Sequence, residues 1–224
     1  MLKNSHNLAR RLLLLGMALG ISACTATATV PPANTGFIQS DQIPGKYAAL
    51  VQTGGWAINA KIEGWNCGAW DFDTDVNPTY VAAMRDGLLR GVGQVVFVDA
   101  PLDPQGMKEG GYDAQIVIMQ GGADGRVGMV PGFFSATSQA EVTLNAIMAV
   151  SDANGPVIQQ PLSARGTAAG NVVWGCNEAA PAVGTAAKNA VELLVKDAVL
   201  YARDGIRKKR DRAFTTPEPA KPVS

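Results

Sequence analysis

The sequence contains no hydrophobic run long enough to cross a membrane as a helix. Its longest run, Leu12–Ile21, has about ten residues, whereas a helix needs about 20 to span the hydrocarbon core. The basic residues Lys3, Arg10 and Arg11 precede this run, and small residues follow it. A basic segment, a short apolar segment and small residues are the three parts of a secretory signal peptide. The pattern therefore predicts an exported protein.

The signal segment ends in Ile21-Ser22-Ala23-Cys24. An aliphatic residue, two small residues and a cysteine resemble the lipobox of bacterial lipoproteins. In that family the cysteine receives a thioether-linked diacylglycerol, and a lipoprotein signal peptidase cuts just before it. The resemblance implies that residues 1–23 are removed and that two or three acyl chains on Cys24 hold the protein stably on a membrane. The alternative is an ordinary signal peptide with a chance cysteine near its end.

The destination of the lipoprotein depends on the residues after Cys24. Lipoproteins of enteric bacteria that stay in the inner membrane carry an aspartate there, whereas this chain has Thr25 and Ala26. The resemblance therefore implies the outer membrane, with the protein on its periplasmic or surface face.

Histidine is almost absent, because the chain has only His6, which leaves with the signal peptide. A mature protein without histidine cannot use Ser-His-Asp or Cys-His catalysis or a histidine-ligated metal. Of the 19 lysines and arginines, three also leave, so 16 remain against 19 acidic residues. That balance argues against a nucleic-acid partner. We expect no catalytic residue, metal or cofactor, although carboxylate or Ser-Lys chemistry stays open.

Cysteine is also scarce, and the three present have separate expected fates. Cys24 carries the lipid, which leaves Cys67 and Cys176 as an even pair in an oxidising compartment. We expect a disulfide between them. The alternative, a reactive thiol, lacks a histidine as its base.

Apolar periodicity divides the mature chain into three parts. Residues 24–44 are rich in Thr, Ala and Pro and predict a flexible tether. Residues 45–206 form one domain. Residues 207–224 begin with four basic residues and contain three prolines, which predicts a disordered tail.

Within the domain, Asn77 as N-cap and Pro78 begin a short helix to Arg90, and a long apolar stripe predicts a second helix over 179–207. Residues 121–132 are glycine-rich and predict a loop or a mobile hairpin. Residues 94–99 are the strongest candidate for a buried strand. The expected strands are 47–52, 56–63, 94–99, 114–120, 139–150 and 157–166, the last two forming a hairpin around the turn 152–155.

This order predicts an α+β fold, a two-layer sandwich in which a mixed or antiparallel sheet carries a short and a long helix on one face. The layout resembles that of small outer-membrane lipoproteins, such as the YajG-type family and the lipoprotein partner of the lipopolysaccharide-export barrel. The resemblance covers residues 45–206 in pattern only and brings no functional residue. It implies envelope assembly or scaffolding.

Two clusters are candidates for function. Asp71, Asp73 and Asp75 have the spacing of a calcium loop, but Val76 and Ala82 stand where that motif needs Gly and Glu, so an acidic loop before a helix is the simpler interpretation. The tryptophans Trp56, Trp65 and Trp70 form either an interaction surface or part of the core.

The function hypothesis is a lipid-anchored, non-catalytic envelope protein that supports the assembly or anchoring of an outer-membrane or cell-surface complex. One alternative is an enzyme that acts on cell-wall or surface polymer through Asp71, Asp73, Asp75 or Glu63. Another is a carrier for a lipid or a small solute.

Overall fold

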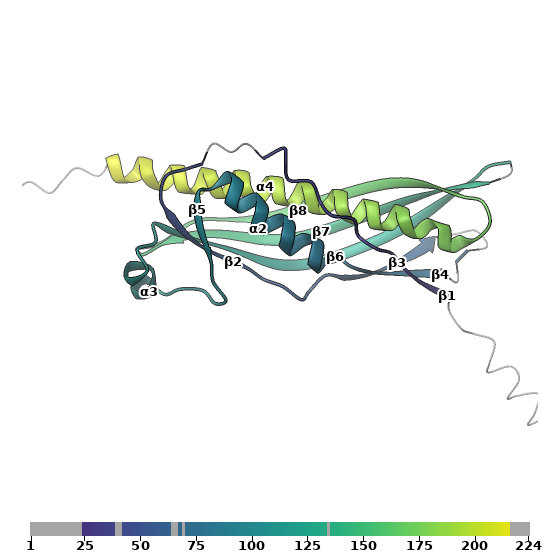
Figure 1. Cartoon of the computed structure of the whole chain (residues 1–224), viewed down its shortest axis with the longest axis horizontal. Coiled ribbons are helices and arrows are strands. Elements are labelled where there is room, and N and C mark those ends of the chain that lie inside the picture. The colour runs from purple at the N-terminus through teal and green to yellow at the C-terminus, as the bar shows by residue number, and fades with distance from the viewer. Residues whose placement is uncertain (1–23, 39–41, 64–66, 69, 134, 216–224) are drawn as a thin grey trace, which may run out of the picture.

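The computed structural model describes residues 24–38, 42–63, 67–68, 70–133 and 135–215. The predicted signal peptide, Trp65 and residues 216–224 of the predicted tail lie outside these ranges. The molecule is elongated (Figure 1). Its strands are β1 Cys24–Thr27, β2 Lys46–Val51, β3 Ala57–Glu63, β4 Trp70–Asp75, β5 Gln94–Phe97, β6 Ala114–Pro131, β7 Ala136–Asp152 and β8 Gly155–Val172. Its helices are α2 Asn77–Gly91, α3 Pro104–Glu109, the 3₁₀ turn η1 Cys176–Ala179 and α4 Ala180–Thr215.

The architecture is the predicted α+β class, built on one mixed sheet of eight strands. The three long strands β6, β7 and β8 form an antiparallel meander. On the edge of β6 opposite β7, β2 pairs in parallel with residues 114–118 and β3 pairs in parallel with residues 126–128. The short strands therefore lie in two groups, one behind the other along β6, with β5 beyond β2 and with β4 and β1 beyond β3.

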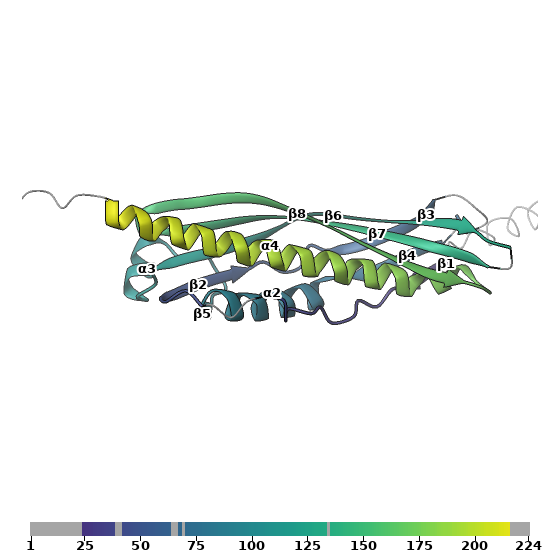
Figure 2. The same cartoon turned by 90° about the horizontal axis from the view of Figure 1, so that it is seen from above.

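The long helix α4 runs along the sheet in both views (Figures 1 and 2). Strand β7 alternates, so that Ala140, Val142 and Leu144 are buried while Glu141 and Thr143 belong to the other face. Leu194, in the middle of the apolar stripe of α4, is fully buried, as the periodicity predicts. Helix α2 packs beside α4. Among the described residues, no helix is long and apolar enough to span a bilayer.

The predicted tether is wrong over residues 24–38 and 42–44, because these described residues are part of the fold. Residues 24–27 form β1, which pairs in parallel with β4. Ala28 and Thr35 are buried, and the Thr29 carbonyl lies so close to α4 that a Cβ on Gly184 would approach it to 2.0 Å. Backbone pairing at a sheet edge needs no apolar period, so composition alone could not reveal this strand.

The predicted disordered tail is wrong over residues 207–215, because α4 continues to Thr215. Lys and Arg are good helix formers, and both Lys209 and Arg210 have partners outside the helix. The ammonium of Lys209 lies 3.9 Å from the Asp152 carboxylate, and Arg210 donates to the Pro44 carbonyl.

Two further expectations are corrected within the sheet. The glycine-rich segment 121–132 continues β6 as far as Pro131, with an irregularity between Gln120 and Ala123. Gly125 lets another strand pack closely, since a Cβ there would lie 2.6 Å from Ile58 Cγ2. The strand expected to be most buried, β5, stands at the end of the strand order and is only half-buried.

Candidate functional site

The predicted lipidation residue lies at one end of the molecule, here called the Cys24 end: Cys24, the disulfide, Phe133, Val173 and Trp174. Cys24 is exposed and is the first residue of β1, where it stands opposite Trp70. The backbone N–H of Trp70 donates to the Cys67 carbonyl at 2.9 Å. In turn, Cys67 is bonded to Cys176, with 5.7 Å between the Cα atoms. The predicted disulfide is confirmed, and it lies close to Cys24.

Three apolar side chains are exposed at the Cys24 end. The side chains of Phe133, between β6 and β7, and Trp174, after β8, are each 92% exposed, and Val173 is 53% exposed. Together with the disulfide they line a hollow of about 370 Å³. One carboxylate organises the segment, because Glu178 Oε2 accepts hydrogen bonds from the backbone N–H groups of Val173 and Trp174. These hydrogen bonds fix the backbone of residues 173–174, from which the Trp174 side chain is exposed.

The predicted tryptophan surface is wrong at Trp56. This side chain is fully buried, packs edge-to-face on Tyr80 with 4.6 Å between ring centroids, and donates from Nε1 to the Gly121 carbonyl. Tyr80 is buried as well, and its burial raises the pKa of the Tyr80 hydroxyl above its ordinary value. Trp70 is half-buried against the core, and Trp65 lies outside the described residues.

Among the tryptophans that the structure describes, Trp174 is the exposed one, and sequence reasoning missed it. The available signal was its position after a strand and two residues before a cysteine, where a short connection leaves little room for core packing.

The three aspartates lie on a strand and not in a loop, so both interpretations of them as a loop are wrong. Because they alternate along β4, they share one face of an extended segment. Asp73 accepts a hydrogen bond from Asn59 Nδ2 at 2.7 Å. Asp75 accepts one at 3.0 Å from the backbone N–H of Asn77, the first residue of α2. The N-cap position is Val76 and not the predicted Asn77. These two carboxylates have structural partners.

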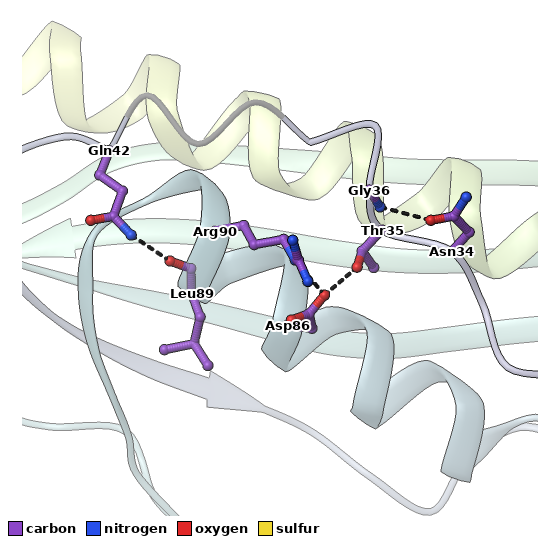
Figure 3. Close-up of polar contacts among 7 residues, drawn as sticks. All are labelled: Asn34, Thr35, Gly36, Gln42, Asp86, Leu89 and Arg90. Atoms are coloured by element: carbon purple, nitrogen blue, oxygen red, sulfur yellow. Dashed lines mark hydrogen bonds and ion pairs between the residues drawn. The ribbon is translucent and has the colours of Figure 1, made fainter.

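Hydrogen bonds hold the segment after β1 against α2 (Figure 3). Thr35 Oγ1 donates to the Asp86 carboxylate, which also accepts from Arg90 Nε at 2.7 Å. Further along, Gln42 Nε2 donates to the Leu89 carbonyl at 3.0 Å. The hydrogen bonds from Arg90 and Thr35 hold the pKa of Asp86 below its ordinary value. The segment that follows Cys24 is therefore fixed to the domain through side chains of α2.

The sheet face away from α4 carries a second hollow, of about 550 Å³. Glu141 on β7 pairs there with Arg126 on β6, at 2.6 Å, and with Arg165 on β8. The two guanidinium groups, Arg126 foremost, lower the pKa of Glu141. The result is a polar, mixed-charge surface across three strands, here called the open sheet face.

No family model matches the sequence, and a search of curated proteins finds no match. Several solved structures are similar at low level, among them the three that follow. The protein XCC0632 of Xanthomonas campestris, assigned to DUF330, is 11% identical, with a TM-score of 0.41, over 86% of this chain and 100% of that one. A neuraminyllactose-binding hemagglutinin homolog from Helicobacter pylori is 10% identical, with a TM-score of 0.43, over 76% of this chain and 95% of that one. The hypothetical protein CT253 from Chlamydia trachomatis is 9% identical, with a TM-score of 0.35, over 73% of this chain and 98% of that one. Likeness at this level supports no assignment of family or function.

Proposed function

We propose that this chain is a lipid-anchored, non-catalytic protein of the bacterial cell envelope, with Cys24 as its lipidated first residue. The lipobox-like Ile21-Ser-Ala-Cys24 carries the proposal. The position of Cys24 supports it, because the cysteine is exposed and begins the first strand. The absence of Asp after Cys24 favours the outer membrane, which fractionation of the two membranes would test.

The partner of such a protein is an envelope or cell-surface complex, and we assign its contact to the open sheet face. Arg126, Glu141 and Arg165 present both signs of charge on a surface formed by three paired strands. A rigid sheet with fixed charges suits recognition of a protein surface, where complementary charges select the partner and its orientation.

Lipidation is tested with Cys24→Ala in cells grown with radioactive palmitate. The wild-type protein should be labelled and cut before residue 24, whereas the variant should be unlabelled and keep its signal segment. The matched control is the double variant Cys67→Ser/Cys176→Ser, which removes the other two cysteines and should keep the label. Equal labelling of wild type and Cys24→Ala would reject the anchor.

The partner surface is tested by placing a photoreactive residue at one position in living cells. Gln139 is exposed on the open sheet face, and Lys196 is exposed on α4. A probe at 139 should give discrete adducts with an envelope protein, and the control at 196 should not. Adducts from 196 alone would place the partner on the helix face and contradict the assignment.

A further inference from the structure

We propose that the Cys24 end is itself a membrane-contacting surface, with Phe133, Val173 and Trp174 inserted into the interfacial region of the lipid bilayer. This inference rests on the lipidation of Cys24 and adds a second, non-covalent contact with the same membrane. Its occupant is a phospholipid surface, recognised by apolar and aromatic burial.

The first argument is the distance between the anchor and the domain. Cys24 is already paired in β1, so no free linker separates the lipid from the sheet. One strand away stands Trp70, whose N–H bonds to Cys67, and Cys67 is bonded to Cys176. Figures 1 and 2 show the start of β1, the β6–β7 connection and the β8–α4 connection at one end of the molecule. Acyl chains on Cys24 therefore bring this end to the headgroups.

The second argument is chemical. Trp is enriched where membrane meets water, since its ring has an apolar body and a polar N–H. Trp174 and Phe133 are the two most exposed of the large apolar side chains in the described part of the chain. The disulfide at Cys176 and the hydrogen bonds from the 173–174 backbone to Glu178 fix the segment in advance. Little conformational entropy is then lost when the rings enter the bilayer.

The third argument is area. Two aromatic side chains bury about 150–250 Å² each, so that the pair offers roughly 300–500 Å². A standard protein interface buries about 800 Å² on each partner. The cluster is too small to hold a second copy of the chain by itself. Beside acyl chains that already supply the main affinity, the same area suffices to set the orientation of the domain on the membrane.

The experiment reconstitutes the lipidated protein in phosphatidylethanolamine/phosphatidylglycerol vesicles that contain acyl-brominated lipid, which quenches tryptophan at short range. Wild-type emission should be quenched, and Trp174→Phe should lose most of the quenched component. The control is Leu200→Ser, an exposed apolar position on α4, which should be quenched like wild type. Equal quenching of wild type and Trp174→Phe would show that Trp174 lies outside the bilayer and overturn the inference.

A second measurement separates this inference from lipidation. The Cys24→Ser chain from residue 24 is titrated with the same vesicles, with and without Phe133→Ser/Trp174→Ser. The double change should weaken partitioning about tenfold or more, whereas Leu200→Ser should leave it unchanged. If palmitate labelling fails but this difference appears, the anchor is wrong and the membrane contact stands. If the labelling succeeds but partitioning is unaltered, or if the double change alters only the oligomeric size, the membrane contact is wrong.

Discussion

The two ends of the β7–β8 hairpin share one ladder but differ in surface chemistry. At the Cys24 end the connections expose Phe133, Val173 and Trp174. At the far end the turn is polar: the Asn154 N–H bonds to Asp152 Oδ1 at 2.7 Å, and Asp152 faces Lys209. Strand pairing holds both ends in the same way, so it does not explain the difference. One end is built for an apolar surrounding and the other for water.

The packing of α4 against the sheet also differs between the Cys24 end and the far end. A Cβ on Gly166 would lie 2.1 Å from the Ala186 carbonyl oxygen and 2.3 Å from the Ala190 nitrogen, so α4 and β8 meet there backbone to backbone. Near the far end, a Cβ on Gly205 would meet only side-chain atoms of Ile158 and Val150. The half that contains Cys24 is therefore fixed by backbone contacts and the disulfide, whereas the far half can adjust through its side chains.

The largest expected effect comes from removing the Cys67–Cys176 disulfide at the Cys24 end. The bond joins residues 109 apart, and Cys67→Ser/Cys176→Ser should lower the free energy of unfolding by about 2–4 kcal/mol. Urea unfolding measures the loss. Hydrogen exchange should increase first around residues 172–180 and remain slow in the first residues of β8. Equal acceleration at both ends would show that the bond supports the whole hairpin and that the ends do not differ.

Periodic apolar patterns predicted much of this fold. The alternation of residues 139–150 and the stripe through Leu194 indicate which side chains are buried, and the structure confirms both elements. The helix beginning near Asn77 and the Cys67–Cys176 pair are also confirmed. In each case the signal is local, or follows from there being only one possible pair.

The features that were missed depend on contacts distant in sequence. Strand β1 is held by backbone bonds to β4, and residues 207–215 stay helical beside partners such as Asp152 and Pro44. Trp56 could be assigned to the core only once Tyr80 and Gly121 were known to surround it. The local sequence of Trp174 does not indicate that it lies at the same end as Cys24, so that position emerges only from the topology.

The next effect concerns the close approach of α4. Gly166→Ala should cost about 1–3 kcal/mol, because backbone atoms of the helix must move to admit the methyl group. Gly205→Ala is the matched change at the far half. There the new Cβ would meet side-chain atoms, Ile158 Cγ2 at 2.7 Å and Val150 Cβ at 3.3 Å, which shift more easily than helix backbone. Alanine also favours the helix by about 1 kcal/mol over glycine, so the net loss should be smaller than at Gly166. Urea unfolding of the two variants compares the halves directly, and equal losses would reject the packing difference.

The smallest effect lies in the segment that leads from the Cys24 end along α2. Hydrogen bonds from Arg90 and Thr35 lower the pKa of Asp86 in the folded state. A lowered folded pKa stabilises the protein above the unfolded pKa of about 4, and this stabilisation disappears as the pH falls through the folded value. The Asp86 side chain is 43% exposed, so solvent screening keeps its contribution below about 1 kcal/mol.

Asp86→Asn should therefore be slightly less stable than wild type at pH 7, and the difference should shrink as the pH is lowered towards 3. Arg90→Gln removes the main partner and should show the same small loss with the same pH dependence. Urea unfolding at a series of pH values measures both. The changes should also leave the disulfide and the exposure of Trp174 unaffected, since Asp86 contacts only the segment at Thr35 and its own helix. A difference that stays constant down to pH 3 would mean that the hydrogen bonds, and not the charge, fasten this segment, and that its hold on the domain does not depend on pH.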